Sequence, residues 1–156
     1  MTFILKDKYL LEVQDNPLEI TKGYDFCLDE RAGAIVIFSG TVRNHNELTD
    51  TVNLIDYQIW ESKALEIMED LAGITFDKYC DLVKIYIAHR FGKLNLKEES
   101  ILIIVSSPHR KAAYEASEFL IDTIKKTLPV WKLEYFNGSV QPSSDTMPIS
   151  SLKHFL

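Results

Sequence analysis

The sequence predicts a single α+β domain in which helices pack against a mixed or antiparallel sheet. Short apolar runs typical of buried strands alternate with longer segments whose apolar residues recur at helical spacing. The length agrees with this, because 156 residues are enough for one domain with a sizeable core. The chain contains no internal repeat, low-complexity block or linker, so residues 1–156 are treated as one unit.

Composition limits the classes of function. The chain is 46% hydrophobic and 26% charged, as soluble globular proteins are, and its formal net charge is -6. Because the overall charge is negative, nucleic acid and anionic lipid are not expected partners, and any cationic site must be local. No segment approaches the roughly 20 apolar residues of a membrane span, and the first residues carry no signal-type apolar run. We therefore expect a cytoplasmic protein that does not contact a membrane.

Metal and cofactor sites are not expected either. The two cysteines, Cys27 and Cys80, lack metal-ligand spacing and should pack as small hydrophobic side chains. The histidines show no ligand spacing and have no cysteine or carboxylate cluster beside them: His45, His89, His109 and His154. The sequence also lacks a Walker loop, a dinucleotide-binding glycine pattern and a nucleophile elbow.

The first third of the chain should supply two strands and a helix. Residues 3–13 are expected to form an edge strand with its turn. Asn16 and Pro17 then favour the start of a helix of about three turns. The run Gly-Ala-Ile-Val-Ile-Phe at residues 33–38 is continuously apolar, which is typical of a central strand covered on both faces.

The middle of the chain continues the alternation of strands and helices. Residues 52–60 have a strand-like pattern whose phase changes between Leu54 and Ile55, which predicts a β-bulge there. Residues 61–79 are amphipathic at helical spacing. Two further strands should follow, at residues 82–88 and 101–105.

The segment between Ser106 and Lys132 predicts a helix with sharp boundaries. Ser107 is suited to the N-cap and Pro108 to the first helical position, while Pro129 ends the helix. Small and apolar residues recur at helical spacing and make one narrow buried face: Ala112, Ala113, Ala116, Phe119, Leu120, Thr123, Ile124 and Thr127.

The C-terminal part of the chain should add one strand and a tail. Residues 131–136 alternate, with aromatic and apolar side chains on one face and Lys132 and Glu134 on the other. After Asn137 and Gly138 the chain is rich in Ser, Pro and Asp, so we expect a loop-like tail from about residue 138.

Cationic residues gather near both ends of the predicted helix. His109 and Arg110 fall in its first turn, where the helix dipole disfavours cations unless an anion binds the free N–H groups. Lys125 and Lys126 lie in the last turn, and Lys132 follows shortly after. We expect the two ends to contribute to one anion-binding pocket. The alternative is solvated surface charge, which is most plausible for Lys126.

Two polar segments follow buried strands, where binding groups are often mounted. Residues 40–46 are polar and contain Arg43, although an ordinary turn with a solvated arginine is an equally good interpretation. His89 and Arg90 end another strand, where a structural hydrogen-bonding corner is the more common arrangement.

Four motifs carry a resemblance to a known family. They are Phe-Ser-Gly-Thr-Val-Arg-Asn-His-Asn at 38–46, His-Arg-Phe-Gly-x-Leu at 89–94, Ser-Pro-His-Arg at 107–110, and Lys-x-x-x-Pro-Val-Trp-Lys at 125–132. In this order and spacing, from about Gly33 to Glu134, the chain resembles the large, catalytic subunit of molybdopterin synthase. The resemblance implies an α/β-hammerhead fold and a homodimer.

The resemblance also implies an activity. A small ubiquitin-like sulfur-carrier subunit would bind at each end of the dimer, giving a heterotetramer, and its C-terminal Gly-Gly thiocarboxylate would enter the pocket. Cyclic pyranopterin monophosphate would receive two sulfurs and become the dithiolene of molybdopterin. Because the carrier brings the sulfur, no cysteine of this chain is needed and no cofactor is implied.

The family's pocket, transferred position by position, falls on Phe38, Arg43, His109, Arg110, Lys125 and Lys132. The resemblance makes Lys125 the central catalytic group, which would stabilise charge on the thiocarboxylate and the acyl intermediate or pass a proton. Lys132 would be its catalytic partner. Arg43, His109 and Arg110 would hold the anionic substrate and carrier end by charge-assisted hydrogen bonds.

The chain departs from the family's pattern in places. No arginine follows Lys132, although the family often places one in its C-terminal segment, and Lys93 and Gln58 stand where acidic residues are common. Two other classes of function are alternatives. One is a non-catalytic phosphate- or nucleotide-binding module that uses the same cations, and the other is an interaction protein whose exposed patch docks a ubiquitin-like tail.

Overall fold

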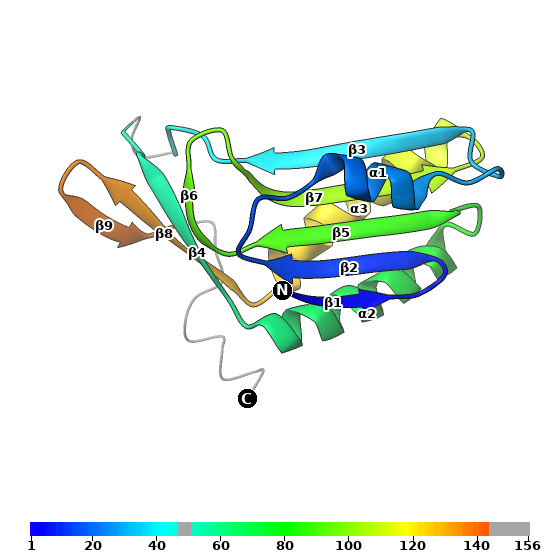
Figure 1. Ribbon diagram of the computed structural model, residues 1–156, viewed down its shortest axis with the longest axis horizontal. Coiled ribbons are helices and arrows are strands. Elements are labelled where there is room, and N and C mark those ends of the chain that lie inside the picture. The colour runs from blue at the N-terminus through cyan, green and yellow to red at the C-terminus, as the bar shows by residue number, and fades with distance from the viewer. Residues whose placement is uncertain (47–50, 144–156) are drawn as a thin grey trace.

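The structure is a computed structural model that describes residues 1–46 and 51–143. This part of the chain forms an α+β domain with a larger and a smaller sheet and three helices, which confirms the predicted class (Figure 1). The larger sheet has five strands in the order β1 (Thr2–Leu5), β2 (Tyr9–Gln14), β5 (Lys84–Arg90), β7 (Glu99–Ser107) and β3 (Ala34–Thr41). Strands β2 and β5 run parallel, and the other neighbours are antiparallel.

The smaller sheet is antiparallel throughout and lies across one end of the larger sheet (Figure 1). Its order is β6 (Gly92–Asn95), β4 (Leu54–Ile59), β8 (Val130–Phe136) and β9 (Ser139–Pro142). Strand β6 follows β5 almost directly, at Gly92, where a φ of 89° redirects the chain in a way that favours glycine. The chain therefore leaves one sheet and enters the other within two residues.

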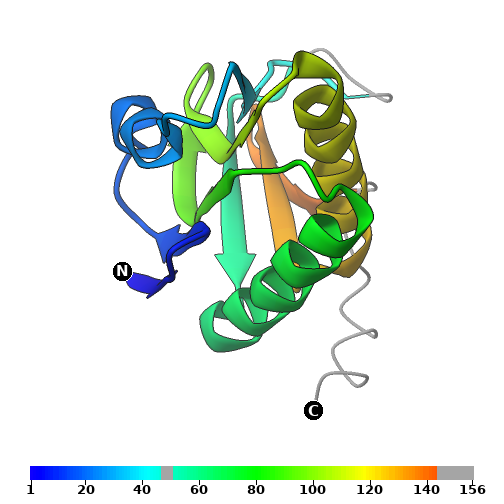
Figure 2. The same ribbon diagram turned by 90° about the vertical axis from the view of Figure 1, so that its right-hand side faces the viewer.

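The helices cover both faces of the larger sheet. Helices α2 (Glu61–Lys78) and α3 (Arg110–Thr127) lie on one face, and α1 (Ile20–Cys27) lies on the other (Figure 2). Because side chains alternate along a strand, Ile85 and Ile87 of β5 pack toward α2 and α3, while Tyr86 packs toward α1. Both faces of β5 are therefore buried against helices.

Strand β3 is not a central strand, contrary to the sequence-based expectation. It is the last strand of the larger sheet on its side, and Ile37 in its middle is 43% exposed. A continuous apolar run shows that both faces of a strand are apolar, but it carries no information about the number of neighbouring strands. The predicted bulge at Leu54 and Ile55 is also wrong, since β4 pairs without interruption with both neighbours. The register shift lies between Gly40 and Thr41 instead.

Helix starts differ from their predicted positions. Helix α1 begins at Ile20 and has eight residues, so it is shorter than expected. Helix α3 begins at Arg110, with His109 at the N-cap. Ser107 is not the cap, because it ends strand β7, where its hydroxyl donates a hydrogen bond to the carbonyl of His109 at 2.5 Å. The pairing of β7 with β3 extends to Ser107, and this keeps the chain extended for longer than the cap motif suggests.

The expected loop-like tail is partly wrong. Residues Ser139–Pro142 form β9, which pairs with β8 across the two-residue turn Asn137-Gly138. Gly138 has a φ of 85°, a left-handed conformation that glycine adopts readily, so glycine suits this position of the turn. The rest of the predicted tail, residues 144–156, lies outside the described residues.

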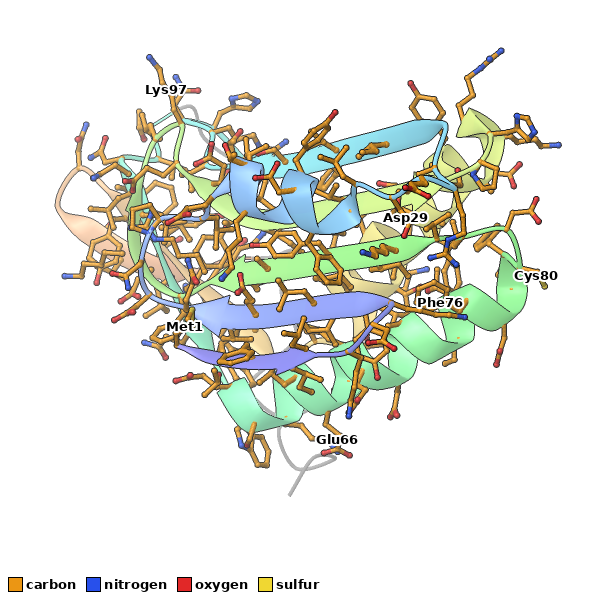
Figure 3. All side chains as sticks on the ribbon, turned by 45° about the vertical axis from the view of Figure 1, so that its right-hand side comes forward. Met1, Asp29, Glu66, Phe76, Cys80 and Lys97 are labelled. Carbon is orange, nitrogen blue, oxygen red and sulfur yellow. The ribbon has the colours of Figure 1, made fainter. Side chains whose placement is uncertain are left out.

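The two cysteines differ in environment. Cys27 is fully buried, as expected, and burial raises the pKa of its thiol to about 12. Cys80 is exposed beyond the end of α2, contrary to expectation (Figure 3). None of the helices in residues 1–46 and 51–143 combines the length and apolar character needed to cross a bilayer.

Candidate functional site

A pocket of about 490 Å³ lies where the two sheets and the end of α3 meet. Three elements supply its main walls: the end of β3 with the residues that follow, the paired strands β4 and β8, and the last turns of α3. These segments are far apart in the sequence, so the pocket exists only because the smaller sheet lies across the end of the larger one.

Strands β4 and β8 supply one wall with four side chains on the same face. Tyr57 is the register partner of Lys132, and Ile55 is the partner of Glu134. Side chains two residues apart in a strand share a face, so Lys132 and Glu134 line the pocket together. The Nζ of Lys132 lies 5.9 Å from the centre of the Tyr57 ring, within the range of a cation–π contact.

Helix α3 supplies a second wall from its last turns. Ile121, Ile124, Lys125 and Leu128 line the pocket, and their spacing of three and four residues puts them on one stripe of the helix. Lys125 therefore lies at the edge of the apolar stripe and reaches the pocket. Lys126, one residue further along, does not line it.

The end of β3 supplies the third wall, and the register shift shapes it. Thr41 pairs with Glu99 after Gly40 pairs with Ile101, so Ser100 is the extra residue, and its hydroxyl donates to the carbonyl of Gly40 at 3.1 Å. A Cβ on Gly40 would lie 2.7 Å from Cγ2 of Ile101, so glycine lets the two strands approach here.

The residues after β3 bring an arginine and an amide to the pocket. Arg43 lines it, and the Nε of Arg43 donates to the carbonyl of His45 at 3.0 Å. Asn46 donates from Nδ2 to Oε2 of Glu134 at 2.5 Å. This bond holds the loop against β8, and the carboxylate of Glu134, which is only 5% exposed, is thereby solvated by an amide.

His89 lies between the two sheets at the inner end of the pocket. It is 6% exposed, and its ring meets that of Tyr57 edge-on with centroids 5.8 Å apart. Nδ1 lies 3.0 Å from the backbone carbonyl oxygen of Arg90. The pKa of His89 is lowered to about 4, mainly by burial and in smaller part by the ammonium group of Lys132, against a raising effect of the bond to the Arg90 carbonyl.

Four of the six predicted site residues meet in this pocket: Phe38, Arg43, Lys125 and Lys132. The other two, His109 and Arg110, lie at the opposite end of α3. An 18-residue helix is about 27 Å long at about 1.5 Å per residue, so they are remote from Lys125. His109 instead borders an open depression with Lys78 and Lys111 beside the end of α2. The expectation that both ends of the helix form one pocket is therefore wrong for a single chain.

The start of α3 nevertheless has the features of an anion site. No side chain caps its first N–H groups, and its first turn contains no acidic residue. His109 and Arg110 are both exposed there. Free N–H groups, the positive end of the helix dipole and two cationic side chains thus face solvent together.

Sequence patterns left out several pocket residues: Asn46, Tyr57, His89 and Glu134. Glu134 could have been predicted as a pocket residue from the sequence, because strand periodicity places it on the same face as Lys132. His89 was interpreted as a structural corner, and its bond to the Arg90 carbonyl agrees with that, but the residue also lines the pocket. Within residues 1–46 and 51–143, no group of three His, Cys, Asp or Glu side chains is arranged to hold a metal ion.

Comparison with known proteins gives consistent matches. Residues 13–127 match the family model described as MoaE protein. The chain is 39% identical over 126 residues to molybdopterin synthase catalytic subunit 1 of Aedes aegypti, with 81% of each chain covered. It superposes on molybdopterin synthase from Staphylococcus aureus with a TM-score of 0.81 and 28% identity, covering 90% of this chain and 99% of that one.

A further match shows the fold in an assembly. A protein–protein complex of subunits 1 and 2 of molybdopterin-converting factor from Helicobacter pylori contains a chain that matches with a TM-score of 0.73 and 22% identity. The match covers 90% of this chain and 95% of that one.

Proposed function

The chain belongs to the MoaE family, and from this premise we propose that it is the catalytic subunit of a molybdopterin synthase, a sulfurtransferase of molybdenum cofactor biosynthesis. The observation that carries the proposal is the convergence of Arg43, Lys125 and Lys132 on one pocket in a chain whose net charge is -6. A cationic pocket on an acidic protein selects small anionic ligands locally.

The proposed reaction moves sulfur from the C-terminal thiocarboxylate of a small carrier protein to cyclic pyranopterin monophosphate. Both reactants are anionic, so Arg43 binds an oxyanion through charge-assisted hydrogen bonds. Lys125 stabilises the negative charge that develops at the carbonyl of the carrier end during acyl transfer. Lys132, held over the Tyr57 ring, acts beside it on the phosphate or the leaving sulfur. Phe38 provides an apolar wall for the pterin ring.

The proposed protein partner is a small ubiquitin-like carrier ending in Gly-Gly. The Helicobacter pylori complex supports a two-subunit assembly for this fold. Strand and loop residues form part of the pocket wall. An extended tail that ends in two glycines suits such a wall, because it has no side chains at its end. We expect this chain to co-purify with such a partner in a complex of two copies of each.

A homodimer would bring the cationic N-terminal end of α3 in one copy close to the cationic C-terminal end of α3 in the other. Among the described strands, β3 has a neighbour on one side only, and apolar side chains are exposed around it: Ile37 on the strand, Tyr24 and Leu28 near α1, and Tyr114 on α3. An unpaired edge with an exposed apolar residue is the kind of strand that pairs with a second chain. We propose that two copies associate about a twofold axis along their β3 edges.

The direction of β3 determines which parts of the two copies would meet in this dimer. At the start of β3, the N–H of Gly33 donates to the carbonyl of Ser107, which lies two residues before His109. Ala34 pairs with the same residue. At the other end of the strand, Thr41 lines the pocket. Eight residues at about 3.4 Å each span about 27 Å, the same length as α3. Antiparallel pairing of two β3 strands therefore puts the start of one beside the end of the other. His109 and Arg110 of each copy would then approach the pocket of its partner.

The experiment that tests the function mixes this protein with thiocarboxylated carrier and the pterin precursor, and measures the dithiolene product. Formation of product that depends on both reactants is the expected result. Tight binding of simple nucleotides without any need for a carrier would instead favour a phosphate-binding module. Carrier binding without product would favour a docking module, and either outcome would overturn the proposal.

A further inference from the structure

His89 presents an uncharged basic nitrogen to a cationic pocket. A backbone carbonyl only accepts hydrogen bonds, so the 3.0 Å contact of Nδ1 with the Arg90 oxygen fixes the proton on Nδ1. The other ring nitrogen, Nε2, is then unprotonated. Within the described residues, no group forms a hydrogen bond with Nε2, and this atom is not buried. Because the ring lines the pocket, Nε2 is open to it.

The surroundings keep this nitrogen available. Burial and the nearby ammonium of Lys132 lower the pKa of His89 to about 4, so the ring is neutral at physiological pH. The edge-on contact with Tyr57 fixes the ring plane. Of the other charged groups that line the pocket, Arg43, Lys125 and Lys132 are hydrogen-bond donors, and Glu134 already accepts a bond from Asn46.

The reaction needs a group of this kind at one step, given the proposed function. When the thiocarboxylate sulfur bonds to a pterin carbon, an oxygen substituent of that carbon leaves with the bonding electron pair, and the carrier remains joined to the pterin through an acyl–sulfur bond. Release requires water to add its oxygen to the carbonyl carbon and to lose a proton. The carbon–sulfur bond to the acyl group then breaks with its electron pair going to the sulfur. The sulfur stays on the pterin as a thiolate, and the carrier leaves as a carboxylic acid that loses a second proton to solvent and becomes a carboxylate.

We propose that Nε2 of His89 is the base that takes the proton from this water. Lys125 stabilises the oxyanion of the tetrahedral intermediate, and the cations of the pocket stabilise the thiolate that leaves. The imidazolium formed on His89 is more acidic than an ordinary imidazolium because it is buried, so it returns the proton to solvent before the second sulfur transfer. His89 thus has two functions, one for each ring nitrogen.

Two substitutions separate these functions. In His89→Asn the side-chain amide nitrogen can replace Nδ1 and donate to the Arg90 carbonyl, but no atom replaces Nε2. In His89→Gln the amide reaches the position of Nε2 and can hold a water molecule, but it cannot take the proton. Circular dichroism and the size of the complex establish that both variants fold and assemble.

The experiment is a single turnover with thiocarboxylated carrier and pterin precursor, followed by intact-mass measurement of the carrier. We expect both variants to form the first carbon–sulfur bond, and the carrier–pterin adduct to accumulate because its hydrolysis falls about 10²- to 10⁴-fold. Neutral hydroxylamine should cleave this adduct, as expected for an acyl–sulfur bond. The loss should be larger in His89→Asn than in His89→Gln.

Three outcomes would overturn the inference. Hydrolysis at the wild-type rate in His89→Asn would show that the role of His89 is limited to its structural bond with the Arg90 carbonyl. A loss of turnover without any adduct would place His89 at an earlier step. A wild-type protein that makes no dithiolene would remove the proposed function itself, which distinguishes that failure from a failure of the role of His89.

Discussion

The two ends of α3 carry similar charge but lie in different surroundings. At its C-terminal end, Lys125 reaches a pocket walled by two sheets and shares it with Lys132. At its N-terminal end, His109 and Arg110 are exposed, beside a helix start that has no side-chain cap. The comparison shows that a cluster of cations in the sequence does not define a site. Lys125 is itself exposed, so the difference is that the pocket walls bring Arg43 and Lys132 close to it.

The comparison also explains why the exposed end still matters. Charges in open solvent contribute little by themselves, since water screens them. If the edges of two β3 strands pair, the same charges are brought to the mouth of a pocket in the other copy. The N-terminal end of α3 would then be half of a site, and the pocket at its C-terminal end would be the other half.

The largest expected effect is at the C-terminal end of α3. Lys125→Ala should lower the rate of dithiolene formation by about 10²- to 10³-fold, because it removes a charge-stabilising group from the pocket. Lys126→Ala is the matched control, since Lys126 is adjacent in sequence but does not line the pocket. Size-exclusion chromatography should show that both variants keep the wild-type assembly. Wild-type turnover in Lys125→Ala would refute the role of this residue.

The next effect is at the exposed end. Arg110→Ala should lower activity by about 10- to 100-fold, because it removes charge-assisted hydrogen bonds worth roughly 1.5–3 kcal/mol. Mixing this variant with Lys125→Ala should restore activity if the site is shared between copies. Half of the exchanged dimers would be mixed and each would hold one intact site, so about a quarter of wild-type activity is expected. No recovery after subunit exchange would mean that Arg110 and Lys125 do not act across the dimer.

A third prediction concerns the edge that connects the two ends. Ile37→Glu should convert the dimer to a monomer, because two carboxylates would face each other near the twofold axis and replace apolar contact. Activity should fall to about the level of Arg110→Ala. Ile74→Glu on α2 is the control, because Ile74 is 54% exposed but lies away from β3. Light scattering measures the molar mass, and an unchanged dimer in Ile37→Glu would place the interface elsewhere.

The last prediction concerns stability instead of activity, and it comes from the pocket. The pKa of His89 is about 4 in the folded protein and 6.5 in an unfolded chain, so the unfolded state binds a proton first as pH falls. The wild type should therefore lose up to about 3 kcal/mol of unfolding free energy between pH 6.5 and pH 4, and no more from this group below pH 4. Urea unfolding of His89→Asn should show a correspondingly weaker loss over the same range. Parallel pH curves for the two proteins would show that His89 is not buried in its neutral form.

Some of this protein could be predicted from the sequence because the signals are local. The apolar stripe of α3, the alternation along β8 and the motifs at 38–46 and 125–132 each depend on neighbours within a few residues. Periodicity therefore gave the α+β class, the buried face of the helix, and Lys132 and Glu134 on one face of a strand. The Asn137-Gly138 turn was available as a hairpin signal, but the polar composition after it favoured a loop.

Other features depend on contacts that no local pattern records. The position of β3 at the edge of the sheet follows from which strands find partners, and that is a property of the whole chain. His89 and Tyr57 meet because the smaller sheet crosses the end of the larger one, which their own segments do not specify. The sequence by itself determined which residues carry charge and which faces are apolar, since both are set by side-chain chemistry and backbone period. Only the tertiary structure decided which charges share a pocket, because a rigid helix about 27 Å long keeps its two ends apart.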